Sequence, residues 1–205
     1  MASTTAAPDE TAAATGPPAA TVGQTAAVWQ RFVDARPIGS LALVSVIATQ
    51  LGTYFGYVFP AVGLPVLPWP LYNGILGSTI ADGVNGAVVD EAFAVSSNAF
   101  FVGHTLHFVN GIVFGVLFGI LARDMLPGRN TPSGSTVKGL LYGVIMTIIS
   151  VGLLVPYAYL PEQGYGLFLF DGPDGWKLPF AILVWHLIYG FFLGALWQPK
   201  ETAQD

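Results

Sequence analysis

The sequence predicts an all-α, polytopic integral membrane protein whose four transmembrane helices form a bundle. Of its 205 residues, 53% are hydrophobic and 9% are charged, and its mean hydropathy is +0.62. Soluble domains carry about 25% charged residues, so water is not the main solvent of this chain. Four apolar runs approach the roughly 20 residues that a helix needs to cross a bilayer. They cover about residues 38–59, 99–122, 137–158 and 178–198.

The four runs are predicted to be helices because a backbone in lipid must satisfy its own hydrogen bonds. The runs also lack the alternating pattern of a barrel strand. Residues 1–28, rich in Ala, Thr and Pro, predict a disordered cytoplasmic tail without the basic start and apolar core of a signal peptide. The transmembrane domain, 29–199, begins with a short interfacial helix in "VWQRFVDARP", and 200–205 form a second cytoplasmic tail.

The distribution of basic residues predicts that both termini lie in the cytoplasm. Six of the seven Lys and Arg residues fall before the first run, between the second and third, or after the fourth, and the exception is Lys177. The positive-inside rule places the basic side in the cytoplasm. The small four-span layout is typical of prokaryotic proteins that accompany larger assemblies, so we expect the cell membrane of a prokaryote.

Both outer loops are apolar and rich in ring side chains. The first, about 60–98, is predicted to lack a regular helix and to lie on the membrane surface or across the mouth of the bundle. This prediction rests on Pro60, Pro65, Pro68 and Pro70. The second, 156–177, carries several Tyr, Phe and Trp residues. Its rings form an interfacial belt or dock a partner subunit.

The pattern His-x3-Gly-x3-Gly occurs twice, as "HFVNGIVFG" at 107–115 and as "HLIYGFFLG" at 186–194. The two copies lie in the second and fourth runs, which cross the membrane in the same direction. This arrangement suggests a duplicated two-helix hairpin, a repeat type that membrane transporters use. The first and third runs match each other less well, because their glycines fall at different depths.

Glycines spaced by four predict close helix packing in lipid, because residues four apart share a face and glycine lets a neighbouring backbone approach. We expect the second and fourth helices to pack on each other through these faces. The predicted packing residues are Gly103, Gly111, Gly115, Gly119, Gly190 and Gly194.

Histidines on those faces point toward protein, and intramembrane ionisable residues are functional candidates by default. In the simplest interpretation each imidazole is neutral and bonds a neighbouring side chain. The main candidate hydrogen-bond partners of the imidazoles are Gln50, Asn110 and Tyr189, and further candidates are Thr53, Thr147 and Ser150.

Two cofactor hypotheses compete with that interpretation. His107 and His186, at similar depth on two helices, are the axial pair that a membrane haem b requires. Alternatively His104 and His107, three residues apart, hold copper or zinc together with Asp90 or Glu91 of the preceding loop.

Several functions are excluded or disfavoured by composition. The chain has no cysteine, so disulfides, Cys-ligated zinc and thiol nucleophiles are excluded. A net charge of -5 does not indicate the basic surface that nucleic-acid binding requires. We find no G-x-S-x-G, H-E-x-x-H or P-loop motif, and therefore no reaction class to name. No acidic or basic residue is expected deep in a span, where ion-coupled carriers usually bury one.

The leading hypothesis is a non-catalytic membrane subunit that scaffolds or stabilises a larger complex. Its partners would be the lipid bilayer and other membrane subunits or a second copy of the chain, recognised through glycine faces and aromatic outer loops. The second hypothesis is a haem- or metal-binding redox subunit using the paired histidines. The third is a small transporter or channel.

Overall fold

The computed structural model describes residues 21–82, 97–127, 131–159 and 164–199. Within these ranges every regular element is helical, and no strand occurs. Four helical segments are long and apolar enough to cross a membrane, as the sequence predicts: Pro37–Val62, Phe101–Leu121, Pro132–Tyr159 and Lys177–Leu196. The chain is therefore a multi-pass helical protein of the membrane class.

The first helix, α1 (Val22–Ala35), begins inside the segment expected to be a disordered tail. Thr21 and Gln24 form a capping box that satisfies backbone donors at its start. Pro37 opens the next helix, α2 (Pro37–Val58), because proline is tolerated in a first turn but not in a helix interior. The Trp29 indole donates to the Leu196 carbonyl at 2.8 Å, which ties α1 to the end of the last helix.

The expectation of no regular helix over 60–98 is wrong for its central part. A short 3-10 turn, η1 (Phe59–Val62), follows α2, and then α3 spans Trp69–Asp82. Pro70 is the second residue of α3, a position where its missing N–H costs nothing. The prolines therefore delay the helix instead of abolishing it.

The remaining spans are less regular than their apolar runs suggest. The helix α5 (Ser97–Leu117) continues through a π-helical turn, η2 (Phe118–Ala122), into α6 (Arg123–Met125). The third span begins as α7 (Pro132–Ile149) and becomes the π-helix η3 (Ser150–Tyr159), which contains Pro156. After the 3-10 turn η5 (Leu167–Leu169), α8 covers Lys177–Leu196. π-helical segments often mark functional sites.

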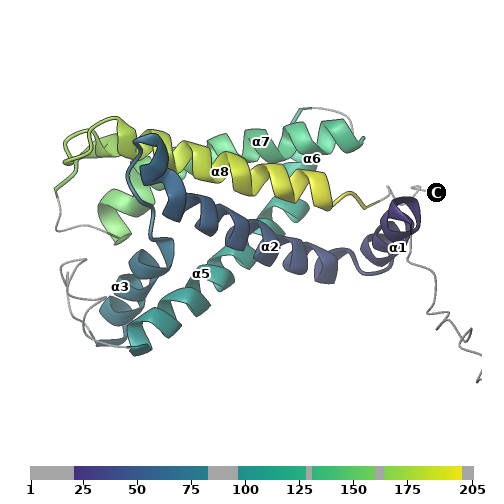
Figure 1. Cartoon of the computed structure of the whole chain (residues 1–205), viewed down its shortest axis with the longest axis horizontal. Helices are drawn as coiled ribbons and strands as arrows, with labels where there is room; N and C mark the ends of the chain where they lie inside the picture. The colour runs from purple at the N-terminus through teal and green to yellow at the C-terminus, as the bar shows by residue number, and fades with distance from the viewer. Residues whose placement is uncertain (1–20, 83–96, 128–130, 160–163, 200–205) are drawn as a thin grey trace, which may run out of the picture.

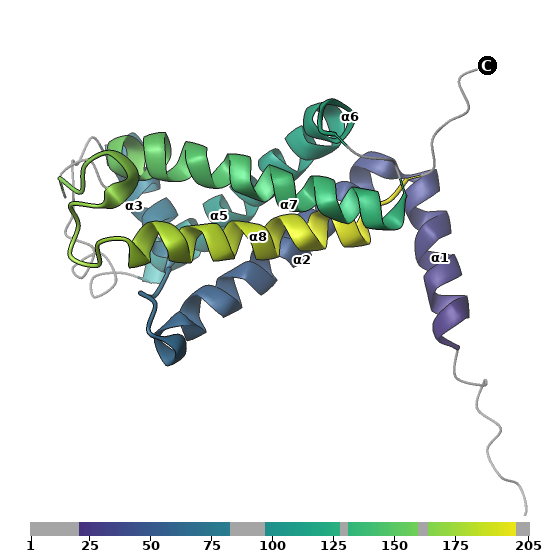
Figure 2. The ribbon, with the colours of Figure 1, turned by 90° about the horizontal axis from the view of Figure 1, so that it is seen from above.

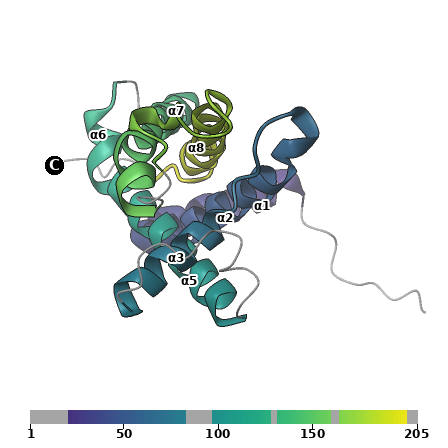
Figure 3. The same ribbon diagram turned by 90° about the vertical axis from the view of Figure 1, so that its left-hand side faces the viewer.

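The spans are arranged as two helix pairs on either side of α2. In Figures 1 and 2, α7 and α8 run side by side along their length. Figure 3 shows α3 and α5 as a second group, apart from α7 and α8, with α2 between the two groups. The predicted bundle of the four helices and the predicted duplication of a two-helix hairpin both stay predictions.

The glycine faces make close contacts, but the prediction that they join the second and fourth helices is wrong. In α5, Gly103 faces the backbone of Pro70 in α3, whereas Gly111 and Gly115 face Thr49 and Ser45 of α2. Gly119, in η2, faces Leu41 of α2. In α8, Gly190 and Gly194 face the backbones of Gly139 and Ser135 in α7. Helix periodicity predicts which residues share a face, but not which neighbour covers that face.

Lys138 lies near the start of the third span, and it leaves the expectation of no charged residue deep in a span uncontradicted. Thr131 caps α7, so the helix starts before the apolar run does and places Lys138 in its second turn. The residue is 3% exposed, and its neighbour Gly139 packs on the backbone of Gly190 in α8. The third span therefore buries one cation near its N-terminal end.

Candidate functional site

A partly enclosed cavity lies between the two helix pairs, near the middle of α8 and along the second half of α5. The space open to the centre of a water-sized molecule is about 50 Å³. A single water needs roughly 10–15 Å³ on this measure, so the cavity holds a few waters or one small molecule. None of the described residues that line it carries a formal charge: Trp69, Asn73, His107, Asn110, Gly111, Phe114, Met146, Ser150, Leu154, Tyr159, Trp185, His186 and Tyr189.

His107 reaches the cavity from α5 and is held by two hydrogen bonds. Its Nε2 lies 2.8 Å from Thr53 Oγ1, and its Nδ1 lies 3.4 Å from Asn73 Nδ2. The Thr53 hydroxyl already donates to the Thr49 carbonyl at 2.8 Å, so it accepts from His107. The proton of His107 is therefore on Nε2, and Nδ1 accepts from Asn73.

His186 approaches from α8 with the opposite tautomer. Its Nδ1 lies 2.9 Å from the Ile182 carbonyl oxygen, which accepts only, so Nδ1 carries the proton. Its Nε2 accepts from the Ser150 hydroxyl at 3.3 Å. Both histidines thus fit their surroundings as neutral imidazoles, as the simplest interpretation of the sequence requires.

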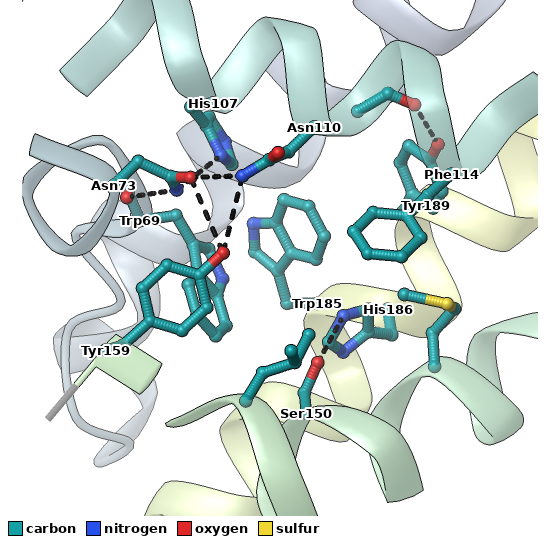
Figure 4. Close-up of a pocket in the computed structure, with 13 residues that line it drawn as sticks. Trp69, Asn73, His107, Asn110, Phe114, Ser150, Tyr159, Trp185, His186 and Tyr189 are labelled. Atoms are coloured by element: carbon teal, nitrogen blue, oxygen red, sulfur yellow. Dashed lines mark hydrogen bonds between the residues drawn. The ribbon is translucent and has the colours of Figure 1, made fainter. Parts of the chain in front are cut away.

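A polar corner surrounds His107 and joins three segments. The Asn73 side chain donates to the Trp69 carbonyl and accepts at Oδ1 from Asn110. The Tyr159 hydroxyl, from η3, lies 3.5 Å from Asn73 Oδ1 and 3.4 Å from Asn110 Nδ2. Figure 4 shows these groups converging on one side of the cavity. The corner therefore links α3, α5 and the π-helical end of the third span.

The indole of Trp185 separates the two histidines. Its ring centroid lies 5.8 Å from that of His107 and 5.1 Å from that of His186. A notch in α2 receives this ring, because a Cβ at Gly52 would lie 2.9 Å from Trp185 Cε2 and one at Gly56 would lie 3.3 Å from Cδ1. The ring also stacks on Tyr189 at an interplanar angle of 11°. Glycine in α2 is thus required by an aromatic ring of the cavity wall.

The haem hypothesis does not fit this arrangement. Axial ligands must point their nitrogens at one iron from opposite sides of a macrocycle. Here His107 Nε2 bonds Thr53 of α2, His186 Nε2 bonds Ser150 of the third span, and the Trp185 ring lies between them. Both donor nitrogens therefore point away from a shared centre.

The metal hypothesis gains no support either. Among the described residues no three His, Asp or Glu side chains come close enough to hold a metal ion. His104 does not line the cavity, and Asp90 and Glu91 lie outside the described residues. The predicted set of His104, His107, Asp90 and Glu91 therefore stays untested as a whole.

Two of the three main predicted polar partners of the histidines, Asn110 and Tyr189, line the cavity. Asn110 joins the polar corner, and the Tyr189 hydroxyl donates to the Gly111 carbonyl at 2.6 Å. Gln50 is half-buried and does not line the cavity. Sequence reasoning missed Trp69 and Asn73, which lie in a helix that it did not expect. It also missed Trp185, although Trp185 and Tyr189 are four residues apart on one helical face.

No protein-family model matches the chain, and comparison with curated proteins and with solved structures finds no match either. The fold and the site define the class as a multi-pass helical membrane protein with four candidate spans and a cavity whose described lining is aromatic and uncharged.

Proposed function

We propose that this protein binds a small solute in the cavity between its helix pairs and carries that solute across the membrane. The observation that supports this function best is the cavity itself: polar side chains from four helical segments meet there without filling the space. Protein interiors are close-packed and retain few voids of this kind. A subunit that served packing alone would gain dispersion energy by closing the space.

The position of the cavity also supports carriage. Transporters place their sites near the bilayer midplane, where discontinuous helices meet. Here α3 is a 14-residue helix, shorter than a span, and its first turns supply Trp69 and Asn73. The third span changes from α- to π-helix at Ser150, which also lines the cavity. Irregular backbone at membrane depth is tolerated where it lines a cavity.

The contacts between the two helix pairs are hydrogen bonds and ring contacts, which a relative movement of the pairs can break and form again. Tyr142 and Tyr189 reach from α7 and α8 to the carbonyl oxygens of Phe114 and Gly111 in α5, at 2.7 and 2.6 Å. Individual hydrogen bonds of this kind contribute about 0.5–1.5 kcal/mol each. Rocking of one pair against the other would break these two bonds, the bonds of Tyr159 to the polar corner and the ring contact between Trp69 and Trp185. The α7–α8 pair would stay joined through its own glycine contacts.

Flux into liposomes tests this proposal. The purified protein is reconstituted, and uptake of small neutral, anionic and cationic solutes is compared with that of empty liposomes. Leu154→Trp places a large ring in the cavity, and we expect it to reduce flux at least about tenfold by blocking the site. Leu153→Trp is the matched control, because Leu153 is 56% exposed on the outside of the same segment. Flux equal to that of empty liposomes for every solute would overturn the proposal.

A second candidate is the scaffold subunit, and the segment after η3 favours it. Phe168 and Leu169 both adopt left-handed backbone conformations, with φ of 59° and 65°, which are costly for residues with side chains. Leu169 is fully buried, while Leu167 and Phe170 are each 57% exposed. Exposed apolar side chains held by a strained backbone suit a docking surface.

The scaffold candidate predicts a stable partner in mild detergent. Replacing Leu167 and Phe170 by Ser should release that partner while the chain stays folded. A strictly monomeric preparation with no co-purifying protein would remove this candidate. Because the carrier does not require a partner, the two outcomes separate the candidates.

A further inference from the structure

We infer that the solute is an uncharged molecule of about four non-hydrogen atoms that offers a hydrogen-bond acceptor to Trp69. The inference rests on the proposed function, because it names the class of solute for the same cavity. Three properties of the cavity lead to it: its lack of charge, an unpartnered donor in its wall, and its size.

The lack of charge in the cavity lining disfavours ions as the bound solute. The described lining residues carry no formal charge, and both imidazoles are assigned as neutral by their hydrogen-bond partners. An ion that leaves water for such a site loses its hydration and finds no countercharge. A neutral solute does not meet this barrier.

The unpartnered donor is the indole N–H of Trp69. This side chain is 5% exposed, and its Nε1 has no hydrogen-bond partner among the described residues. A buried donor without an acceptor destabilises the folded chain, because the N–H has lost its hydrogen bond to water. Figure 4 shows the ring beside Tyr159, in the wall that faces Trp185 and His186. A solute that brings a carbonyl or hydroxyl oxygen to this wall removes the cost.

Trp185 is less suited to that role, although its Nε1 also lacks a partner. A Cβ at Gly52 would lie 3.1 Å from this nitrogen, so the N–H edge of Trp185 is pressed against α2. Trp69 instead meets Trp185 edge-on, with ring centroids 5.8 Å apart, and meets His186 at 6.1 Å. These rings leave flat apolar faces beside the donor, which a small planar group can cover.

The size property limits the solute. The cavity volume of about 50 Å³ corresponds to a few water-sized groups. Acetamide and urea have this size, carry a carbonyl acceptor and are uncharged. Acetate and guanidinium share their shapes but carry charge. The four molecules therefore separate charge from shape.

The test uses the full chain in lipid nanodiscs with 15N-labelled tryptophan, which gives one indole N–H signal for each of its five tryptophans. We expect acetamide and urea to shift the Trp69 signal in a saturable way, and acetate and guanidinium to bind at least about tenfold more weakly. Trp69→Phe keeps a ring but removes the donor, and it should weaken acetamide binding about tenfold, as measured by saturation transfer on the acetamide methyl. Trp176→Phe is the control, since Trp176 is 61% exposed outside the cavity.

Equal binding of acetate and acetamide, unchanged affinity in Trp69→Phe, or no acetamide and urea binding at all would each overturn the inference. The liposome assay decides the proposed function separately. Flux of an ion that Leu154→Trp blocks would uphold the carrier and remove this solute class. Selective acetamide binding without flux of any solute would uphold the class and remove carriage.

Discussion

The hydroxyl of Tyr189 donates a 2.6 Å hydrogen bond to the carbonyl oxygen of Gly111, and this bond joins the fourth span to the second. Gly111 also packs closely on α2, where an added Cβ would meet the side chain of Thr49. The two copies of His-x3-Gly-x3-Gly thus meet through one tyrosine instead of through their glycine faces. The space beside that bond is the cavity.

Removing this bond should loosen the two helix pairs. We expect Tyr189→Phe to lower the free energy of unfolding by about 0.5–1.5 kcal/mol, since the ring stays and only the hydroxyl is lost. Unfolding by denaturing detergent, followed by circular dichroism, measures the change. Tyr54→Phe serves as the control, because Tyr54 is 61% exposed. Equal stability of the two variants would show that the bond contributes nothing.

The hydrogen bond of His107 to Thr53 should stabilise the first and second spans. Thr53→Val leaves the Nε2–H of His107 buried without an acceptor, and we expect a loss of about 1–3 kcal/mol. The same unfolding assay measures it. Thr105→Val is a matched control, because both threonines also donate to a backbone carbonyl four residues earlier, at 2.8 and 2.9 Å, and Thr105 is exposed. A Thr53→Val variant no less stable than Thr105→Val would contradict the assignment.

Close contact between α7 and α8 should make Gly139 intolerant of a side chain. An added Cβ would overlap the Gly190 carbonyl oxygen, a backbone atom that cannot turn aside. We expect Gly139→Ala to destabilise the protein by about 1–3 kcal/mol or to prevent its folding. Gly152→Ala, in the same span, should be tolerated because its nearest neighbour would be Phe168 Cε1 at 3.6 Å. Similar expression and thermal stability for both variants would refute the predicted helix contact.

The notch in α2 should control the position of Trp185. In Gly52→Ala the new Cβ would lie 2.9 Å from Trp185 Cε2, so the indole must shift toward the cavity. The Trp185 indole N–H signal should move, and acetamide affinity should fall. Gly39→Ala, in the same helix, would place its Cβ 3.9 Å from the nearest atom and should leave both unchanged. An unmoved Trp185 signal in Gly52→Ala would show that the notch does not hold the ring.

Sequence alone predicted the features that depend on local composition. Four apolar runs of membrane-spanning length are four helices in the structure, because length and hydropathy suffice to predict them. The close approach at Gly103, Gly111 and Gly190 also follows from spacing by four. Thr53 and Ser150, two of the predicted polar partners of the histidines, bond His107 and His186.

What sequence could not predict depends on contacts between distant segments. The prolines near residue 68 argued against a regular helix, so the sequence did not predict α3. It therefore did not predict Trp69 and Asn73 as cavity residues. The predicted partner of each glycine face was wrong because lipid-exposed helices have no hydrophobic force that selects one neighbour. The sequence predicts Lys138 between the second and third spans, whereas the Thr131 cap starts α7 at Pro132 and places Lys138 in its second turn.

The accessibility of the cavity to water-borne reagents tests the account most directly. The chain contains no cysteine, so Leu154→Cys and Leu153→Cys each introduce a single thiol, one in the cavity wall and one 56% exposed on the outside of the same helix. Methyl methanethiosulfonate reacts with the thiolate, which forms in contact with water and not in hydrocarbon. In nanodiscs we predict modification of Leu154→Cys at least about ten times faster than that of Leu153→Cys, as followed by mass spectrometry. Equal rates, or no reaction at Leu154→Cys, would contradict a solute-accessible cavity between the helix pairs.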